Sequence, residues 1–143
     1  MEKLGGSLSQ LAQGVLPGFL PAGFRFDIGT TVDIGRLAAA ELLAGPKGIE
    51  IVEFGGPARS MKDAAAILLE LTHRPVAVQE VPVTMAPTVL GSFEFPAAFA
   101  SLYQEMLTGI ASGHVAYEGG HRRVQGTTPF EQVLAGLVAI SGH

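Results

Sequence analysis

Apolar residues recur every three or four positions along much of this chain, which is the spacing of a helix that turns one face toward a core. The first such stretch predicts a short helix over 4–15, ended by a proline and a glycine at 17 and 18. The next predicts a helix over 31–44, whose apolar stripe consists of Ile34, Leu37, Ala38 and Leu42. Gly45-Pro46 then ends this helix.

Hydroxyl side chains stand where two of the predicted helices begin. Thr30 precedes the helix just described and has Asp33 three residues on. Ser60 and Asp63 repeat this arrangement before a further apolar-striped stretch that ends near His73. In such a cap the hydroxyl accepts from a free backbone N–H, and the carboxylate reaches back to the cap residue. We therefore expect both helices to begin directly after these hydroxyls.

Runs rich in β-branched residues predict two strands, over 49–54 and 76–81. The remainder is mostly helical, with a helix over 97–110 and a last helix that starts at Thr128-Pro129-Phe130-Glu131. Residues 114–126 between them are expected to form a loop, with or without a short extended piece. Two strands alone make a poor sheet. The pattern therefore predicts either a sheet that a partner completes or a sheet whose first strands are missing.

The composition indicates a single soluble domain over 1–143. Hydrophobic residues make up 48% and charged residues 15%, which excludes an intrinsically disordered chain. The net charge of -4 argues against direct contact with nucleic acid, which requires a basic face. There is no cysteine, so disulfides and cysteine-based zinc sites are excluded. No apolar run reaches the roughly 20 residues of a membrane span, and we expect a cytoplasmic protein.

None of the common catalytic or cofactor motifs is present in the sequence. A dinucleotide site requires Gly-x-Gly-x-x-Gly between a strand and a helix, and the nearest feature is the run from Gly55 to Ser60. Its Pro57 lacks an N–H donor, so a plain turn is favoured over an anion site. The tyrosine–lysine pair of reductases and the Gly-x-Ser-x-Gly of hydrolases are also absent. We therefore assign no catalytic residue and no cofactor-binding residue.

The histidines give no metal site either. His114 and His121 lie seven residues apart in a glycine-rich stretch, with Glu118 between them. That spacing matches no helical or turn-based pair of metal ligands. The adjoining basic residues at 121–123 are interpreted as a solvated turn.

Large apolar residues between 85 and 106 have two interpretations. They are either part of the core or the lining of a pocket for an apolar ligand. The candidates for such a cleft are Met85, Phe93 and Tyr103.

Five segments together resemble NmrA-like proteins, an atypical branch of the short-chain dehydrogenase/reductases. Residues 31–39 are similar to that family's Asp-Ile-Gly-Arg-x-Ala-Ala helix. Its late strand and turn resemble Val52-Glu53-Phe54-Gly55-Gly56-Pro57, and its following helix resembles Ser60-Met61-Lys62-Asp63-Ala64-Ala65. Its next strand resembles Arg74-Pro75-Val76 with Glu80-Val81-Pro82. Its C-terminal run resembles Tyr117-Glu118-Gly119-Gly120 with Gly126-Thr127-Thr128.

The resemblance implies the C-terminal part of a Rossmann-like NmrA-type fold, α/β with few strands and several helices, without its N-terminal dinucleotide-binding half. Full-length members bind NADP or NAD through glycines of that half, so no cofactor is expected in this chain. The expected function is a ligand-cleft lobe, inactive alone, of a NAD(P)-binding regulator or reductase. Two alternatives are part of a quinone- or dye-reductase-like oxidoreductase, active only with an N-terminal half, and a stand-alone small-molecule or protein-binding module. Expected partners are a small apolar ligand and a further copy or half at an open sheet edge.

Overall fold

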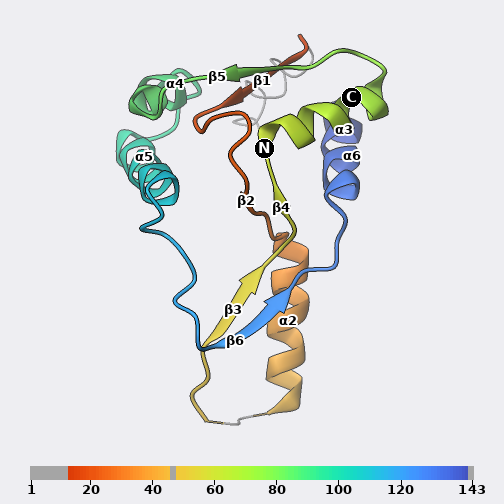
Figure 1. Ribbon diagram of the computed structural model, residues 1–143, viewed down its shortest axis with the longest axis vertical. Helices are drawn as coiled ribbons and strands as arrows, with labels where there is room; N and C mark the ends of the chain where they lie inside the picture. Colours follow the sequence, from red (N-terminus) through yellow and green to blue (C-terminus); the bar gives the residue numbers. More distant parts are fainter. Residues whose placement is uncertain (1–12, 46–47, 142–143) are drawn as a thin grey trace.

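Six short strands pair into three two-stranded ladders within residues 13–45 and 48–141, the part of the chain that the computed structural model describes (Figure 1). The strands are β1 (Val15–Gly18), β2 (Phe26–Asp27), β3 (Val52–Gly55), β4 (Ala58–Arg59), β5 (Ala77–Glu80) and β6 (Arg122–Gln125). The helices are α2 (Thr31–Ala44), α3 (Met61–Thr72), α4 (Ala86–Ser92), α5 (Ala97–Ala111) and α6 (Phe130–Ser141), with a 3-10 turn, η2, at Val83–Met85. The fold is mixed α/β, as the sequence pattern predicts.

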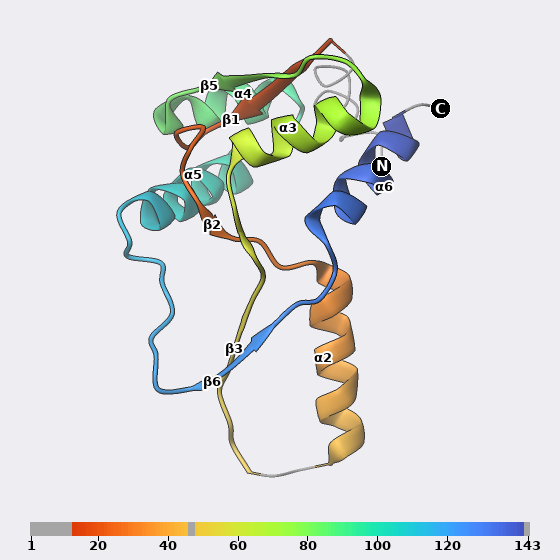
Figure 2. The same ribbon diagram turned by 45° about the vertical axis from the view of Figure 1, so that its right-hand side comes forward.

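The elements form a body and an arm, which both views show (Figures 1 and 2). The body consists of the β1–β5 ladder with α3, α4, α5 and α6. The arm consists of α2 and the β3–β6 ladder, which lie side by side and project from the body. The short β2–β4 ladder lies where the two parts meet.

The two strands predicted from the sequence are confirmed in position, but they do not pair with each other. β5 pairs in parallel with β1, and β3 pairs in parallel with β6. Only the β2–β4 ladder is antiparallel. Each predicted strand thus takes its partner from a segment with no clear alternating pattern. The sequence pattern predicts the two strands but not the segments of this chain that pair with them.

The end of the first predicted helix is also wrong, because Val15 begins strand β1. Gly14 has φ 77, a left-handed conformation that a helix cannot contain. The carbonyl oxygens of Gly14 and Gly18 accept from the N–H groups of Ala77 and Val81, both at 2.8 Å. Pairing with β5 therefore makes this segment a strand rather than the end of a helix. The remainder of that predicted helix, with Leu4, Leu8 and Leu11, lies outside the described residues.

The capping box predicted for α3 is confirmed. The Ser60 hydroxyl accepts from the backbone N–H of Asp63, and the Asp63 carboxylate accepts from the backbone N–H of Ser60 at 2.9 Å. His73 ends the helix in a left-handed conformation with φ 54. The predicted start of α5 at Ala97 is confirmed as well.

The core lies between α3 and α6. Leu68 is 1% exposed and packs with Ala64 and Leu134, while Ile67 and Phe130 border this cluster. Among the described residues Leu68 is the one large side chain that is fully buried. The described residues therefore share a small core.

Most of the apolar stripe predicted for α2 is exposed, and Leu37 is its half-buried member, at a pocket that Phe54 and Val124 also line. Leu42 is 82% exposed and Leu43 89%, and Ile34 is also exposed. Ile49 and Ile51, which follow the helix, are exposed too. The sequence pattern predicts a helix face that packs against other residues, and most of this face is exposed among the described residues. Exposed apolar residues that gather in this way mark contact surfaces.

Asp33 joins the arm to the body through hydrogen bonds to the loop before α6. The backbone N–H and the hydroxyl of Thr128 donate to its two carboxylate oxygens, both at 2.9 Å. Thr30 caps α2 as predicted, since its hydroxyl accepts from the Asp33 N–H at 3.1 Å. The carboxylate does reach the Thr30 hydroxyl, but its hydrogen bonds to Thr128, 95 residues away, have the larger effect on it. The Thr128 hydroxyl donates to Asp33, so it connects the residues before α6 with the first turn of α2.

These contacts hold the pKa of Asp33 below its usual range. The largest cause is the Thr128 backbone N–H, and burial opposes it, while neighbouring hydroxyls and the Arg36 guanidinium lower the pKa further. The ionised carboxylate therefore stabilises the fold above the unfolded-state pKa of about 3.9. That stabilisation is lost as the pH falls through the lower, folded-state value.

The Asp33→Asn variant tests this linkage. We expect its melting temperature near neutral pH to be about 5 °C below that of the parent chain, because charge-assisted hydrogen bonds are lost. Its melting temperature should also fall less steeply below about pH 4. Calorimetric melts across this pH range measure both effects. Glu105→Gln, on the exposed side of α5, is the matched control and should keep the parent profile. An unchanged acid slope in Asp33→Asn would contradict the assignment.

Candidate functional site

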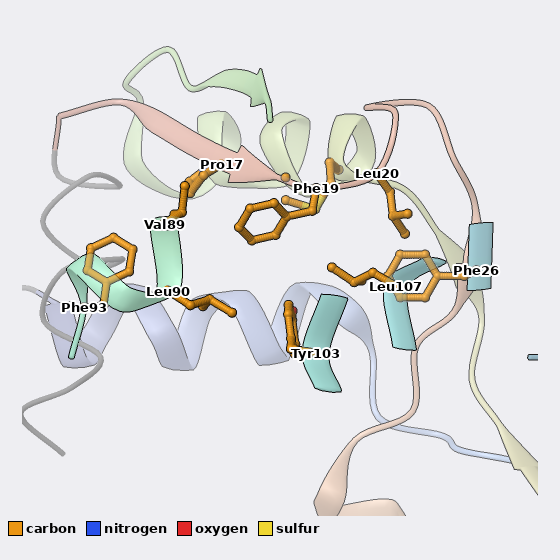
Figure 3. Close-up of a pocket in the computed structure, with 11 residues that line it drawn as sticks. Pro17, Phe19, Leu20, Phe26, Val89, Leu90, Phe93, Tyr103 and Leu107 are labelled. Atoms are coloured by element: carbon orange, nitrogen blue, oxygen red, sulfur yellow. The ribbon is translucent and has the colours of Figure 1, made fainter. Parts of the chain in front are cut away.

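A cavity of about 240 Å³ lies between β1, α4 and α5 in the body (Figure 3). Strand β1 and the turn after it form one wall, and the two helices form the other. The residues that line it are Pro17, Gly18, Phe19, Leu20, Phe26, Met61, Val89, Leu90, Phe93, Tyr103 and Leu107. None of these side chains carries a charge, so the cavity suits an apolar molecule.

Tyr103 is the one lining residue among them with a side-chain hydroxyl. Its ring meets Phe19 edge to face, with centroids 6.3 Å apart. On the other side it stacks with Phe99 at 5.9 Å, and Phe99 stacks in turn with Phe95 at 5.1 Å. Aromatic contacts at these separations restrict the ring. The cavity wall thus includes a held aromatic surface with one polar group.

Two of the three cleft residues expected from the sequence lie together at this cavity. Phe93 enters from the end of α4 and Tyr103 from α5 (Figure 3). Met85 belongs to η2, is 44% exposed and is not among the lining residues. Apolar spacing within helices does not predict the opposite wall of the cavity. Phe19 and Leu20 of that wall follow β1, a strand that the sequence pattern does not predict.

A second pocket, of about 280 Å³, opens where β2, the end of α5 and the loop at 115–117 meet. It is lined by Phe26, Asp27, Ile110, Val115, Ala116 and Tyr117. The Tyr117 hydroxyl donates to Oδ2 of Asp27 at 3.0 Å, and Arg123 donates to the same oxygen at 2.6 Å. The Arg123 guanidinium also lies 4.1 Å above the centroid of the Tyr117 ring. This pocket therefore has apolar walls and one polar corner.

The polar corner keeps the Tyr117 phenol protonated. Burial raises the pKa of Tyr117, and the Asp27 carboxylate raises it further, while Arg123 opposes both. Gly55 leaves the space for this arrangement, because a Cβ at that position would collide with the Tyr117 hydroxyl. In this state the phenol is a hydrogen-bond donor rather than a base.

The turn before α3 does not fit a pyrophosphate. A phosphate site at a helix start requires free backbone N–H groups and no competing anion. Here the N–H groups of Ser60 and Asp63 are taken by the capping box, and that of Lys62 donates to the Ala22 carbonyl at 3.0 Å. The Asp63 carboxylate already lies at this end of the helix. The residues form the strand-to-helix turn that the sequence favours.

The histidines of the loop after α5 lie apart from both pockets. His121 lies 3.4 Å from a carboxylate oxygen of Glu118, and His114 borders a shallow surface of α5. Within 13–45 and 48–141 no group of three or more histidine and acidic side chains is placed to hold a metal ion. In the same part of the chain, no helix combines the length and the apolar character required to cross a membrane.

The cavity and the second pocket are thus the candidate sites for a small molecule in the described residues, while other hollows lie along α5 and beside Asp33 and Arg36. Comparison of the chain with models of known families, with curated proteins and with solved structures found no match.

Proposed function

We propose that this chain is the ligand-cleft lobe of an NmrA-like protein and binds a small apolar molecule in the cavity between β1, α4 and α5. The uncharged lining of that cavity is the observation that carries the proposal. In this role the chain positions a ligand and performs no chemistry alone. The five segments that resemble the NmrA-like family support the same interpretation.

The volume sets the size of the ligand. A cavity of about 150 Å³ accepts benzene, so one of about 240 Å³ accepts a body of roughly ten non-hydrogen atoms. Four aromatic side chains in the wall, Phe19, Phe26, Phe93 and Tyr103, favour a planar aromatic body. Naphthalene derivatives meet both conditions and fluoresce, so they are suitable probes.

We expect 1-methylnaphthalene to bind the purified chain, and Phe93→Ala and Tyr103→Ala each to weaken binding about tenfold because an aromatic contact is removed. Fluorescence titration gives the dissociation constants. Met85→Ala is the matched control and should bind like the parent chain, because Met85 lies outside the lining. Equal affinity of the parent chain and the three variants would contradict the proposal.

A second part of the proposal concerns a missing half. The β1–β5 and β3–β6 ladders are parallel and two-stranded within the described residues, whereas parallel sheets are normally larger and covered on both faces. Helix α2, which carries the exposed Leu42 and Leu43, lies beside β3 and β6. We propose that a NAD(P)-binding half, or a second copy of this chain, adds strands at these edges. The alternative function, a quinone- or dye-reductase-like oxidoreductase, then arises only in that assembly.

Thermal melts separate these alternatives. We expect 1-methylnaphthalene at saturating excess to raise the melting temperature, and NADPH to leave it unchanged, because only a ligand that binds the native chain stabilises it. A shift with NADPH would show that a cofactor site exists in this chain and would contradict the missing-half proposal. Sedimentation of the same sample should show oligomers, which a stable monomer would contradict.

A further inference from the structure

The apolar cavity and the second pocket are neighbours that share one wall. Phe26 lines both, and it lies beside Leu107 in Figure 3. Leu107 lines the cavity and Ile110 lines the second pocket, and these two residues are about 4.5 Å apart along the axis of α5. A single aromatic side chain on a two-residue strand thus stands between two spaces of about 240 and 280 Å³.

The two spaces differ in chemistry. The cavity offers uncharged walls, whereas the second pocket contains the Asp27 carboxylate. Both side chains that bond to this carboxylate within the described residues, Tyr117 and Arg123, use Oδ2. Oδ1 therefore remains as an acceptor, and a carboxylate oxygen accepts up to two hydrogen bonds. A ligand group that donates hydrogen bonds would complete this corner.

The charges around the corner favour a cationic donor. Arg123 offsets Asp27, but Glu53 stands directly opposite Arg123 in the β3–β6 register, and its carboxylate accepts from the Gly119 N–H at 2.9 Å. Glu118 lies in the same loop. Asp27, Arg123, Glu53 and Glu118 together carry a net negative charge, and the whole chain carries -4. An ammonium group meets both the hydrogen-bonding and the charge requirement.

We propose that the two spaces form one composite site for a small aromatic amine, whose aryl body fills the cavity and whose ammonium group binds Asp27 past the Phe26 side chain. This inference rests on the proposed function and adds the class of ligand. A chain of about three carbons between the ring and the nitrogen corresponds to the offset of about 4.5 Å between Leu107 and Ile110 along α5.

The test compares two probes that differ in one group, 3-(1-naphthyl)propan-1-amine and 1-propylnaphthalene. In the parent chain the amine should bind about tenfold more tightly, as expected of one hydrogen bond to a charged acceptor. Asp27→Asn should remove this preference and leave the affinity for 1-propylnaphthalene unchanged. Glu53→Gln is the matched control, because Glu53 lines neither space, and it should keep most of the preference.

Different results would contradict the proposed function and the composite site. If 1-propylnaphthalene does not bind the parent chain, the proposed function is wrong. If it binds and the amine shows no preference, or Asp27→Asn keeps the preference, the composite site is wrong. If Asp27→Asn does not fold, the position of the bound amine in the parent chain tests the composite site instead. Nuclear Overhauser effects between the amine-bearing methylene and the Tyr117 ring support the proposal, and their absence in the bound state overturns it.

Discussion

Replacing Leu68 by alanine is expected to lower the free energy of unfolding by about 3 kcal/mol. Leu68 is 1% exposed and lies at the centre of the cluster that joins α3 to α6. The alanine would lose the buried methyl groups and leave a cavity that the surrounding helices fill only in part. Because this is the one large, fully buried side chain of the described residues, its loss falls directly on the packing between α3 and α6.

Urea unfolding followed by circular dichroism measures this loss. With a slope of about 2 kcal/mol per molar, the midpoint should fall by roughly 1.5 M. Leu43→Ala is the matched control, since Leu43 is 89% exposed near the end of α2. It should change stability by no more than about 0.5 kcal/mol. Similar midpoints for both variants would mean that α3 and α6 do not pack as described.

Replacing Gly56 by alanine is expected to cost about 3 kcal/mol, although the change adds a single methyl group. A Cβ at this position would collide with the carbonyl oxygen of Ile28 and lie 3.1 Å from the backbone nitrogen of Gly29. These atoms belong to the main chain, so no side-chain rotation relieves the collision. The nearby β2–β4 ladder contains only two residue pairs and would have to separate. The arm and the body are joined at this point.

Gly35→Ala is the matched control for this change and should have the opposite sign. Gly35 lies within α2, and nothing approaches within 4 Å of its Cβ position. Alanine in a helix interior is favoured over glycine by about 0.8 kcal/mol. Urea midpoints of the two variants should therefore lie on either side of the parent value. A Gly56→Ala midpoint at or above the parent value would disprove the close approach of the two backbone segments.

Local chemistry predicts the helices well and the strands less well. The starts of α2 and α3 depend on a hydroxyl and the backbone directly after it, so Thr30 and Ser60 are sufficient signals. Strand β1 depends on pairing with residues about 60 positions further along the chain, and its sequence contains a proline and two flanking glycines. Such long-range pairing leaves no periodic pattern to read. The Rossmann-like arrangement expected from the family resemblance remains a prediction.

The candidate site was predictable only on the side that belongs to helices. Phe93 and Tyr103 follow from the apolar spacing along 85–106, while Met85 shows how the same spacing includes a residue that lies outside the cavity. The opposite wall, with Phe19 and Phe26, required the path of β1 and β2. Spacing defines which residues share a helix face, and it does not define what lies opposite that face.

By itself, the sequence determined the starts of α2, α3 and α5, the net charge and the absence of cysteine, because all of these depend on residue type and short spacing. Tertiary structure alone decided which strands pair and which apolar stripe stays exposed. It also decided that Asp33 binds Thr128, and that Asp27, Tyr117 and Arg123 meet at one corner. The hydrogen bonds of Asp33 and Asp27 join residues 90 or more positions apart, and chain closure over that distance depends on the whole fold rather than on any local preference.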